Sequence, residues 1–140
     1  MPVQIDWEGL IVGFESRSQQ ITHFFDRQSG DVEQVLERDA ERHAAMSSDP
    51  RFLALPRDSG ERSVGDLEEF LGECEDASCR GELAAALAAP GSVKVYREAL
   101  LRYPKEEARF FHFKEKQALR RAQEWLASMG ILFQKPKRAD

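Results

Sequence analysis

The spacing of apolar residues along the chain predicts a mainly helical protein with a short β region near its N-terminus. Residues 6–15 are expected to form the first helix, because Asp6 is a suitable N-cap and apolar residues follow it at helical spacing. These apolar residues are Trp7, Leu10, Ile11 and Phe14.

Two β-prone runs, residues 20–25 and 31–35, flank a polar loop, a pattern typical of a β-hairpin. Gly30, at the end of the loop, is expected to supply a positive φ. A third apolar run, residues 51–55, is closed by Pro56 and predicts one more strand.

Apolar periodicity predicts helices over most of the remaining chain. The expected helical ranges are 38–47, 64–74, 78–88, 92–103 and 105–128, and Gly130 is a suitable C-cap for the last of them. The predicted fold class is α+β and mainly helical, with about five helices packed on a small antiparallel hairpin or three-stranded sheet. We expect a single globular domain over residues 1–134 and a frayed basic tail over residues 135–140.

Composition places the chain among proteins of the cytoplasm. Its 140 residues are 41% hydrophobic, which suits one domain with one core. The two cysteines are too few for a disulfide framework, and no apolar run reaches the roughly 18 residues that a membrane span needs. The first residues lack the basic and apolar regions of a secretory signal, so we expect a cytoplasmic location and no membrane association.

Charge is unevenly distributed along the chain. Residues 1–90 contain 8 Lys or Arg against 19 Asp or Glu, whereas residues 91–140 contain 12 against 6. The first part is therefore acidic, and the second is basic. This asymmetry indicates either a basic surface for an anionic partner or attraction between the two halves of the protein, and both interpretations stay open.

No motif predicts catalytic, cofactor-binding or metal-binding residues. Cys74 and Cys79 are five positions apart, whereas a structural zinc site needs two close pairs of ligands. Glycine-rich phosphate loops and the nucleophile elbow of hydrolases are absent from the sequence. A cluster of acidic residues is typical of a solvated helix face. Its members are Glu68, Glu69, Glu73, Glu75 and Asp76.

The last helix carries the candidate site for an anion or a partner. Its basic residues fall within an arc of about 80° at 100° per residue, and Phe113 borders them. This predicted basic stripe consists of Lys105, Arg109, His112, Lys116 and Arg120. The core side of the same helix is expected to contain Ala108, Phe111, Ala118, Leu119, Ala122, Trp125, Leu126 and Met129.

Four segments, in this order along the chain, resemble an uncharacterised bacterial protein family, number zero-one-five-eight of the UPF series. They are Phe25–Gly30, Gly91–Arg97, Phe110–Phe113 and Trp125–Ile131. This chain has Ser29, Val93, Tyr96 and Arg97 where the family pattern has Thr, Phe, Phe and Lys. The resemblance implies the order of elements given above, and it implies no activity, cofactor or catalytic residue.

The leading functional hypothesis is a non-enzymatic intracellular interaction module that binds a protein partner or a small ligand through the basic stripe. One alternative is nucleic-acid binding by the same stripe, with Phe113 stacking on an unpaired base. A pI near 5.3 disfavours a dedicated nucleic-acid binder. An enzyme with an unrecognised site is the other alternative. The sequence leaves the oligomeric state open.

Overall fold

The computed structural model describes residues 3–16, 18–57 and 61–136, without the side chains of residues 61–63. It divides into two compact units. The sheet unit comprises residues 1–58 and 118–140, and the helical unit comprises residues 59–117. Each unit has a hydrophobic core of its own.

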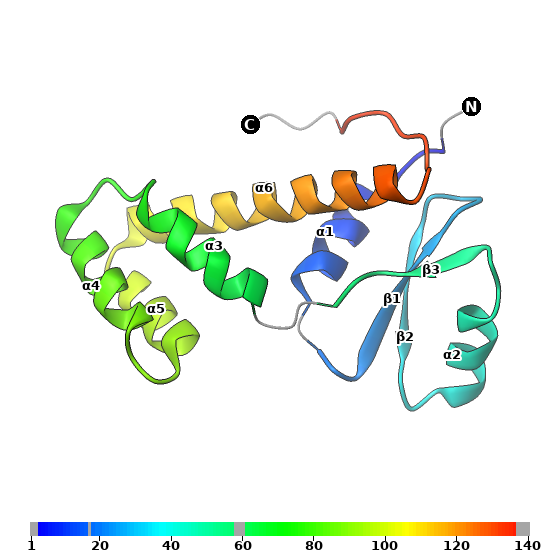
Figure 1. Cartoon of the computed structure of the whole chain (residues 1–140), viewed down its shortest axis with the longest axis horizontal. Coiled ribbons are helices and arrows are strands. Elements are labelled where there is room, and N and C mark those ends of the chain that lie inside the picture. Colours follow the sequence, from blue (N-terminus) through cyan, green and yellow to red (C-terminus); the bar gives the residue numbers. More distant parts are fainter. Residues whose placement is uncertain (1–2, 17, 58–60, 137–140) are drawn as a thin grey trace. The chain divides into compact units, whose positions relative to one another are not determined.

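The sheet unit contains three antiparallel strands and two short helices. Its elements in chain order are α1 (Trp7–Glu15), β1 (Ile21–Asp26), β2 (Val32–Leu36), α2 (Ala40–Ser47) and β3 (Phe52–Ala54). Figure 1 shows β1 between β2 and β3, which gives the strand order β2-β1-β3. The predicted hairpin and the predicted third strand are therefore confirmed.

The turn of the hairpin depends on Asp26 and Gly30. The Asp26 carboxylate accepts hydrogen bonds from the backbone N–H groups of Gln28 (2.9 Å) and Ser29 (3.3 Å). Gly30 has a φ of +82°, as expected, and a Cβ atom there would overlap the carbonyl oxygen of Gln4. Only glycine fits this position without strain.

Both faces of β1 are covered. On one face of the sheet, Phe25 packs with Leu10 of α1 and with Trp125. On the other face, Phe24 packs with Val35 of β2 and with Met46 of α2. Every residue of β1 after Ile21 is buried as a result. A strand covered on both faces needs no alternation of apolar and polar residues.

The helical unit contains α3 (Glu61–Leu71), α4 (Ala77–Leu87), α5 (Ser92–Leu100) and the first part of α6 (Pro104–Ser128). Its core contains the aromatic residues Phe70, Tyr96, Phe110 and Phe113, and Phe70 and Phe110 pack edge to face with ring centroids 5.3 Å apart. The buried Tyr96 hydroxyl donates a hydrogen bond of 2.9 Å to the Leu67 carbonyl. This bond satisfies the single polar group of that ring.

Helix α6 contributes to both cores, and here one expectation from the sequence was wrong. Ala108, Phe111 and Met129 were expected on the core side, but all three are exposed, Phe111 to 48% and Met129 to 43%. Phe110 and Phe113 are buried instead in the helical unit, and Trp125 is buried in the sheet unit. The two parts of α6 bury different faces, so one continuous apolar stripe does not describe the helix.

A glycine cap ends α6. The N–H of Ile131 bonds to the Leu126 carbonyl (3.0 Å), and the N–H of Gly130 bonds to the Ala127 carbonyl (3.1 Å). With a φ of +73° at Gly130, these are the two bonds of a Schellman motif.

The predicted fold class is confirmed, because the described residues form six helices and one antiparallel three-stranded sheet. The expected single domain over residues 1–134 stays a prediction. Of the expected frayed tail, residues 137–140 lie outside the described residues. Among the helices that the structure describes, none combines the length and apolar composition needed to cross a bilayer.

Replacing Asp26 with alanine should lower the stability of the sheet unit. Arg51 donates two hydrogen bonds to the Asp26 carboxylate, of 2.8 and 2.7 Å, and this holds the pKa of Asp26 well below its ordinary range. Without the carboxylate, the turn loses two acceptors for N–H groups, and we expect a loss of about 2 kcal/mol in the free energy of unfolding at neutral pH. Urea unfolding followed by the fluorescence of Trp7 and Trp125 measures this loss.

The exposed Asp31, which also lies in the hairpin, provides the control. Asp31→Ala should change the free energy of unfolding by no more than about 0.5 kcal/mol. Equal losses in the two variants would contradict a special role for Asp26.

Candidate functional site

A groove of about 510 Å³ lies in the helical unit, between α3 with the turn that follows it and the first part of α6. Its lining residues on the α3 side are Glu69, Phe70 and Glu73, and those on α6 are Ala108, Arg109, His112, Phe113, Lys116 and Gln117. We call it the α3–α6 groove. Its size lies within the range of about 300–1,000 Å³ that is usual for ligand sites.

The groove has an apolar floor and a charged rim. Phe70 and Phe113 form the floor, with ring centroids 5.6 Å apart, and they are only 1% and 8% exposed. Acidic residues lie along the α3 side of the rim and basic residues along the α6 side. The two sides therefore differ in charge.

Part of this charge is already neutralised within the helical unit. Arg109 forms an ion pair with Glu75 (2.7 Å) and donates a hydrogen bond to the backbone carbonyl of Glu73 (3.0 Å). The Arg109 guanidinium lowers the pKa of Glu75 for this reason. Gln117 donates a 2.6 Å hydrogen bond to the Glu69 carboxylate.

Three rim side chains have no such partner. Glu73, His112 and Lys116 are exposed, and their side chains form no hydrogen bond or ion pair with the part of the chain that the structure describes. Spacings of three and four residues place Arg109, His112 and Lys116 along one face of α6. Two cationic or ionisable groups and one carboxylate are thus available to an incoming molecule.

The structure brings together four of the six residues predicted from the sequence. Arg109, His112, Phe113 and Lys116 line the groove, whereas Lys105 and Arg120 do not. Phe113 belongs to the core cluster and offers little surface for stacking on a base.

The α3 side of the groove was not predicted as part of a site. Its acidic residues were interpreted as a solvated helix face, although Glu69 and Glu73 lie on either side of the buried Phe70 in sequence. Two acids four residues apart beside a core aromatic residue indicate the rim of a helix–helix contact. This spacing is the feature of the sequence that could have identified the α3 side of the groove.

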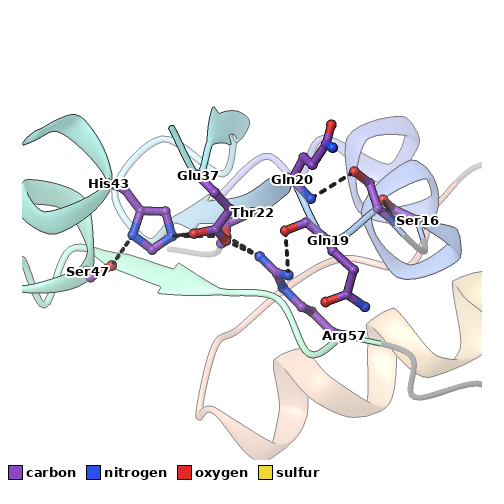
Figure 2. Close-up of polar contacts among 9 residues, drawn as sticks. Ser16, Gln19, Gln20, Thr22, Glu37, His43, Ser47 and Arg57 are labelled. Carbon is purple, nitrogen blue, oxygen red and sulfur yellow. Dashed lines mark hydrogen bonds and ion pairs between the residues drawn. The ribbon is translucent and has the colours of Figure 1, made fainter. Parts of the chain in front are cut away.

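A second polar cluster lies in the sheet unit, around the buried hydroxyl of Thr22 (Figure 2). This hydroxyl donates to Glu37 (2.6 Å), accepts from Arg57 (2.7 Å) and lies 3.0 Å from His43 Nε2. Arg57 also contacts Glu37 directly. The four residues come from β1, the residue after β2, α2 and the segment after β3, so the cluster ties these elements together.

Hydrogen-bond counting assigns the tautomer of His43. A hydroxyl has one proton and two lone pairs, and Thr22 gives its proton to Glu37, so His43 Nε2 must be the donor toward it. Nδ1 is then free to accept from the Ser47 hydroxyl, 3.4 Å away, and Figure 2 shows Ser47 on that side of the ring.

A catalytic triad uses the same residue types as Ser47, His43 and Glu37, but these three residues do not have its geometry. The distances are 3.4 Å from Ser47 to His43 and 3.4 Å from His43 to Glu37, longer than the usual separation of about 2.6–3.2 Å. Ser47 lines neither the α3–α6 groove nor the small cavity described next. We interpret the Thr22 cluster as a structural network.

His23 adjoins a cavity with room for about one water molecule. The cavity has a volume of about 10 Å³, and its lining includes Gly13, Ser16, Ser18 and Arg57. His23 is 6% exposed, and its Nε2 atom has no hydrogen-bond partner among the described protein atoms. Burial, and then the nearby charge of Arg57, lower the pKa of His23.

The two cysteines are free and buried in the core of the helical unit. Burial raises the pKa of the Cys74 thiol to about 12, and burial also raises the pKa of Cys79. Thiols of this kind are poor nucleophiles at neutral pH. Within the described ranges, no three His, Cys, Asp or Glu residues are grouped so that they could hold a metal ion.

Fold and site together define a small, mainly helical α+β protein with a charged surface groove. The model of the Uncharacterised protein family (UPF0158) matches residues 1–137, and the chain therefore belongs to this family. The resemblance inferred from the four sequence segments is confirmed.

The chain is similar to a UPF0158 protein of Pseudomonas aeruginosa, with 27% identity over 133 residues. The alignment covers 93% of this chain and 86% of the relative. The comparison with solved structures found no match.

The sheet unit should lose stability as the pH falls from about 7.5 to about 5.5, because an unfolded His ionises near its ordinary pKa of about 6.5. Folding lowers the pKa of His23, so the unfolded state takes up a proton that the folded state does not bind. The stabilisation is complete above the ordinary pKa and is lost below it, at no more than about 1.4 kcal/mol per pH unit.

Urea unfolding followed by tryptophan fluorescence at several pH values measures this slope in the wild type and in His23→Gln. We expect a shallower slope in the variant. Parallel slopes would show that another group causes the dependence.

Proposed function

We propose that this protein is a non-enzymatic interaction module that binds a segment of a protein partner in the α3–α6 groove. The observation that carries the proposal is the apolar floor of Phe70 and Phe113 beside three rim side chains without partners, Glu73, His112 and Lys116. An apolar centre within a polar rim is the usual arrangement of a protein interface. In the cytoplasm, the location expected from the sequence, the free thiols of this unit would stay reduced.

The charges on the rim specify the chemistry of the partner. A carboxylate of the partner would pair with Lys116 and His112, and a basic group would pair with Glu73. Between them, an apolar side chain would lie against the exposed Ala108 and the small exposed part of Phe113. The partner segment is therefore apolar at its centre and carries charges of both signs.

Nucleic acid fits this groove less well. Glu69 and Glu73 would repel phosphate groups, and Arg109 already forms an ion pair with Glu75. Phosphate binding would instead need the whole predicted basic stripe, including Lys105 and Arg120, which lie outside the groove. The two functions thus share Arg109, His112 and Lys116, and only phosphate binding depends on Lys105 and Arg120.

A titration with 8-anilinonaphthalene-1-sulfonate tests the groove, because this probe combines aromatic rings with one negative charge. We expect Lys116→Glu to weaken its binding by about tenfold, since the change places a carboxylate beside the apolar floor. Dye fluorescence against concentration gives the dissociation constant for each variant, and circular dichroism verifies the fold.

Lys105→Glu and Arg120→Glu are matched controls, because each makes the same charge change on α6 outside the groove. Both should bind the dye as the wild type does. Equal weakening in all three variants would contradict a groove site.

A labelled single-stranded oligonucleotide, titrated at about 50 and 200 mM salt, tests the alternative. Binding that falls steeply with salt, and falls equally in the three variants, would favour nucleic-acid binding by the whole stripe. We expect no binding at the lower salt concentration.

A further inference from the structure

We propose that the partner in the α3–α6 groove is the same groove of a second copy of this chain, so that the protein forms a twofold symmetric dimer. This inference rests on the proposed function and names the partner. It is carried by the opposite charges of the two sides of one groove.

A twofold interface requires a surface that is complementary to itself. Residue i of one copy contacts residue j of the other, and j contacts i in return. The groove meets this condition, because its fully charged lining residues are two acidic ones on the α3 side, Glu69 and Glu73, and two basic ones on α6, Arg109 and Lys116. A groove of one sign would repel its own copy.

Available charges define the contact that holds the dimer together. The side chains of Glu73 and Lys116 are exposed, lie on opposite sides of the groove and have no partner among the described residues. In the dimer, Glu73 of each copy pairs with Lys116 of the other, which forms two equivalent ion pairs.

The net charge of the whole chain opposes dimerisation, so a dimer needs local charge complementarity. With a net charge of −5, two copies repel each other at long range. Association therefore needs a surface where opposite charges meet at close quarters. Because most of the rim is polar, the dimer is expected to dissociate on dilution rather than to be permanent.

Sedimentation velocity of the full chain, over concentrations from about 1 to 500 µM, tests the dimer, since transient interfaces dissociate in this range. We expect a concentration-dependent shift from monomer to dimer for the wild type. Glu73→Lys and Lys116→Glu should each weaken dimerisation by about tenfold or more, because like charges then face each other twice.

Two further samples identify the pairing. The double variant Glu73→Lys/Lys116→Glu restores opposite charges across the interface, and it should dimerise within about threefold of the wild type. An equimolar mixture of the two single variants should form a heterodimer, because each lysine then faces a glutamate. Lys105→Glu, outside the groove, should dimerise as the wild type does.

A wild type that is monomeric at every concentration would overturn the inference, as would a dimer that is unchanged in both single variants. The dye titration on the same samples separates this failure from failure of the proposed function. Binding of the dye that depends on Lys116 in a monomeric protein would leave a groove for another protein partner. If the protein neither dimerises nor binds the dye in a way that depends on Lys116, both proposals are wrong.

Discussion

The rest of the structure depends on a constraint in α6, which must bury different faces in its two parts. Phe110 and Phe113 complete the aromatic core of the helical unit, whereas Ala122 and Trp125 complete the core of the sheet unit. On its first part, the buried face holds Glu106, Phe110, Phe113 and Gln117, and the adjoining face is available to charged residues. Arg109, His112 and Lys116 occupy that adjoining face, and this is why the charged rim of the groove lies there.

Local features of the fold could be predicted from the sequence, and features that depend on distant partners could not. The hairpin follows from two β-prone runs around a loop that ends in Gly30, all within 16 residues of chain. Phe111 was assigned to the wrong environment because it shares a helical face with Ala118 and Trp125, seven and fourteen positions later. Periodicity reveals that a face is apolar, but it does not reveal where along a long helix the buried face changes.

The same limit explains the prediction of the site. Four of the six α6 residues that line the groove, Arg109, His112, Phe113 and Lys116, were predicted, because their spacing is visible within one helix. The α3 side, with Glu69 and Glu73, could not be assigned to the same groove, since it lies more than 35 positions from Arg109. The ion pair between Arg109 and Glu75 bears on the uneven charge of the sequence, because a basic residue of the second part of the chain is neutralised by an acidic residue of the first. What distinguishes Lys116 from Arg109 is the absence of a local counter-charge in the described chain, which only the structure reveals.

The Thr22 cluster also has a consequence for the order of events in folding. Its hydroxyl reaches partners that lie 15, 21 and 35 residues further along the chain, in Glu37, His43 and Arg57. Contacts of such separation require several loops to close first, and each closure costs entropy before any bond forms. The cluster is therefore expected to form late, after the hairpin has formed. Interactions that form late mainly lower the rate of unfolding, and we expect the Thr22 cluster to act in this way.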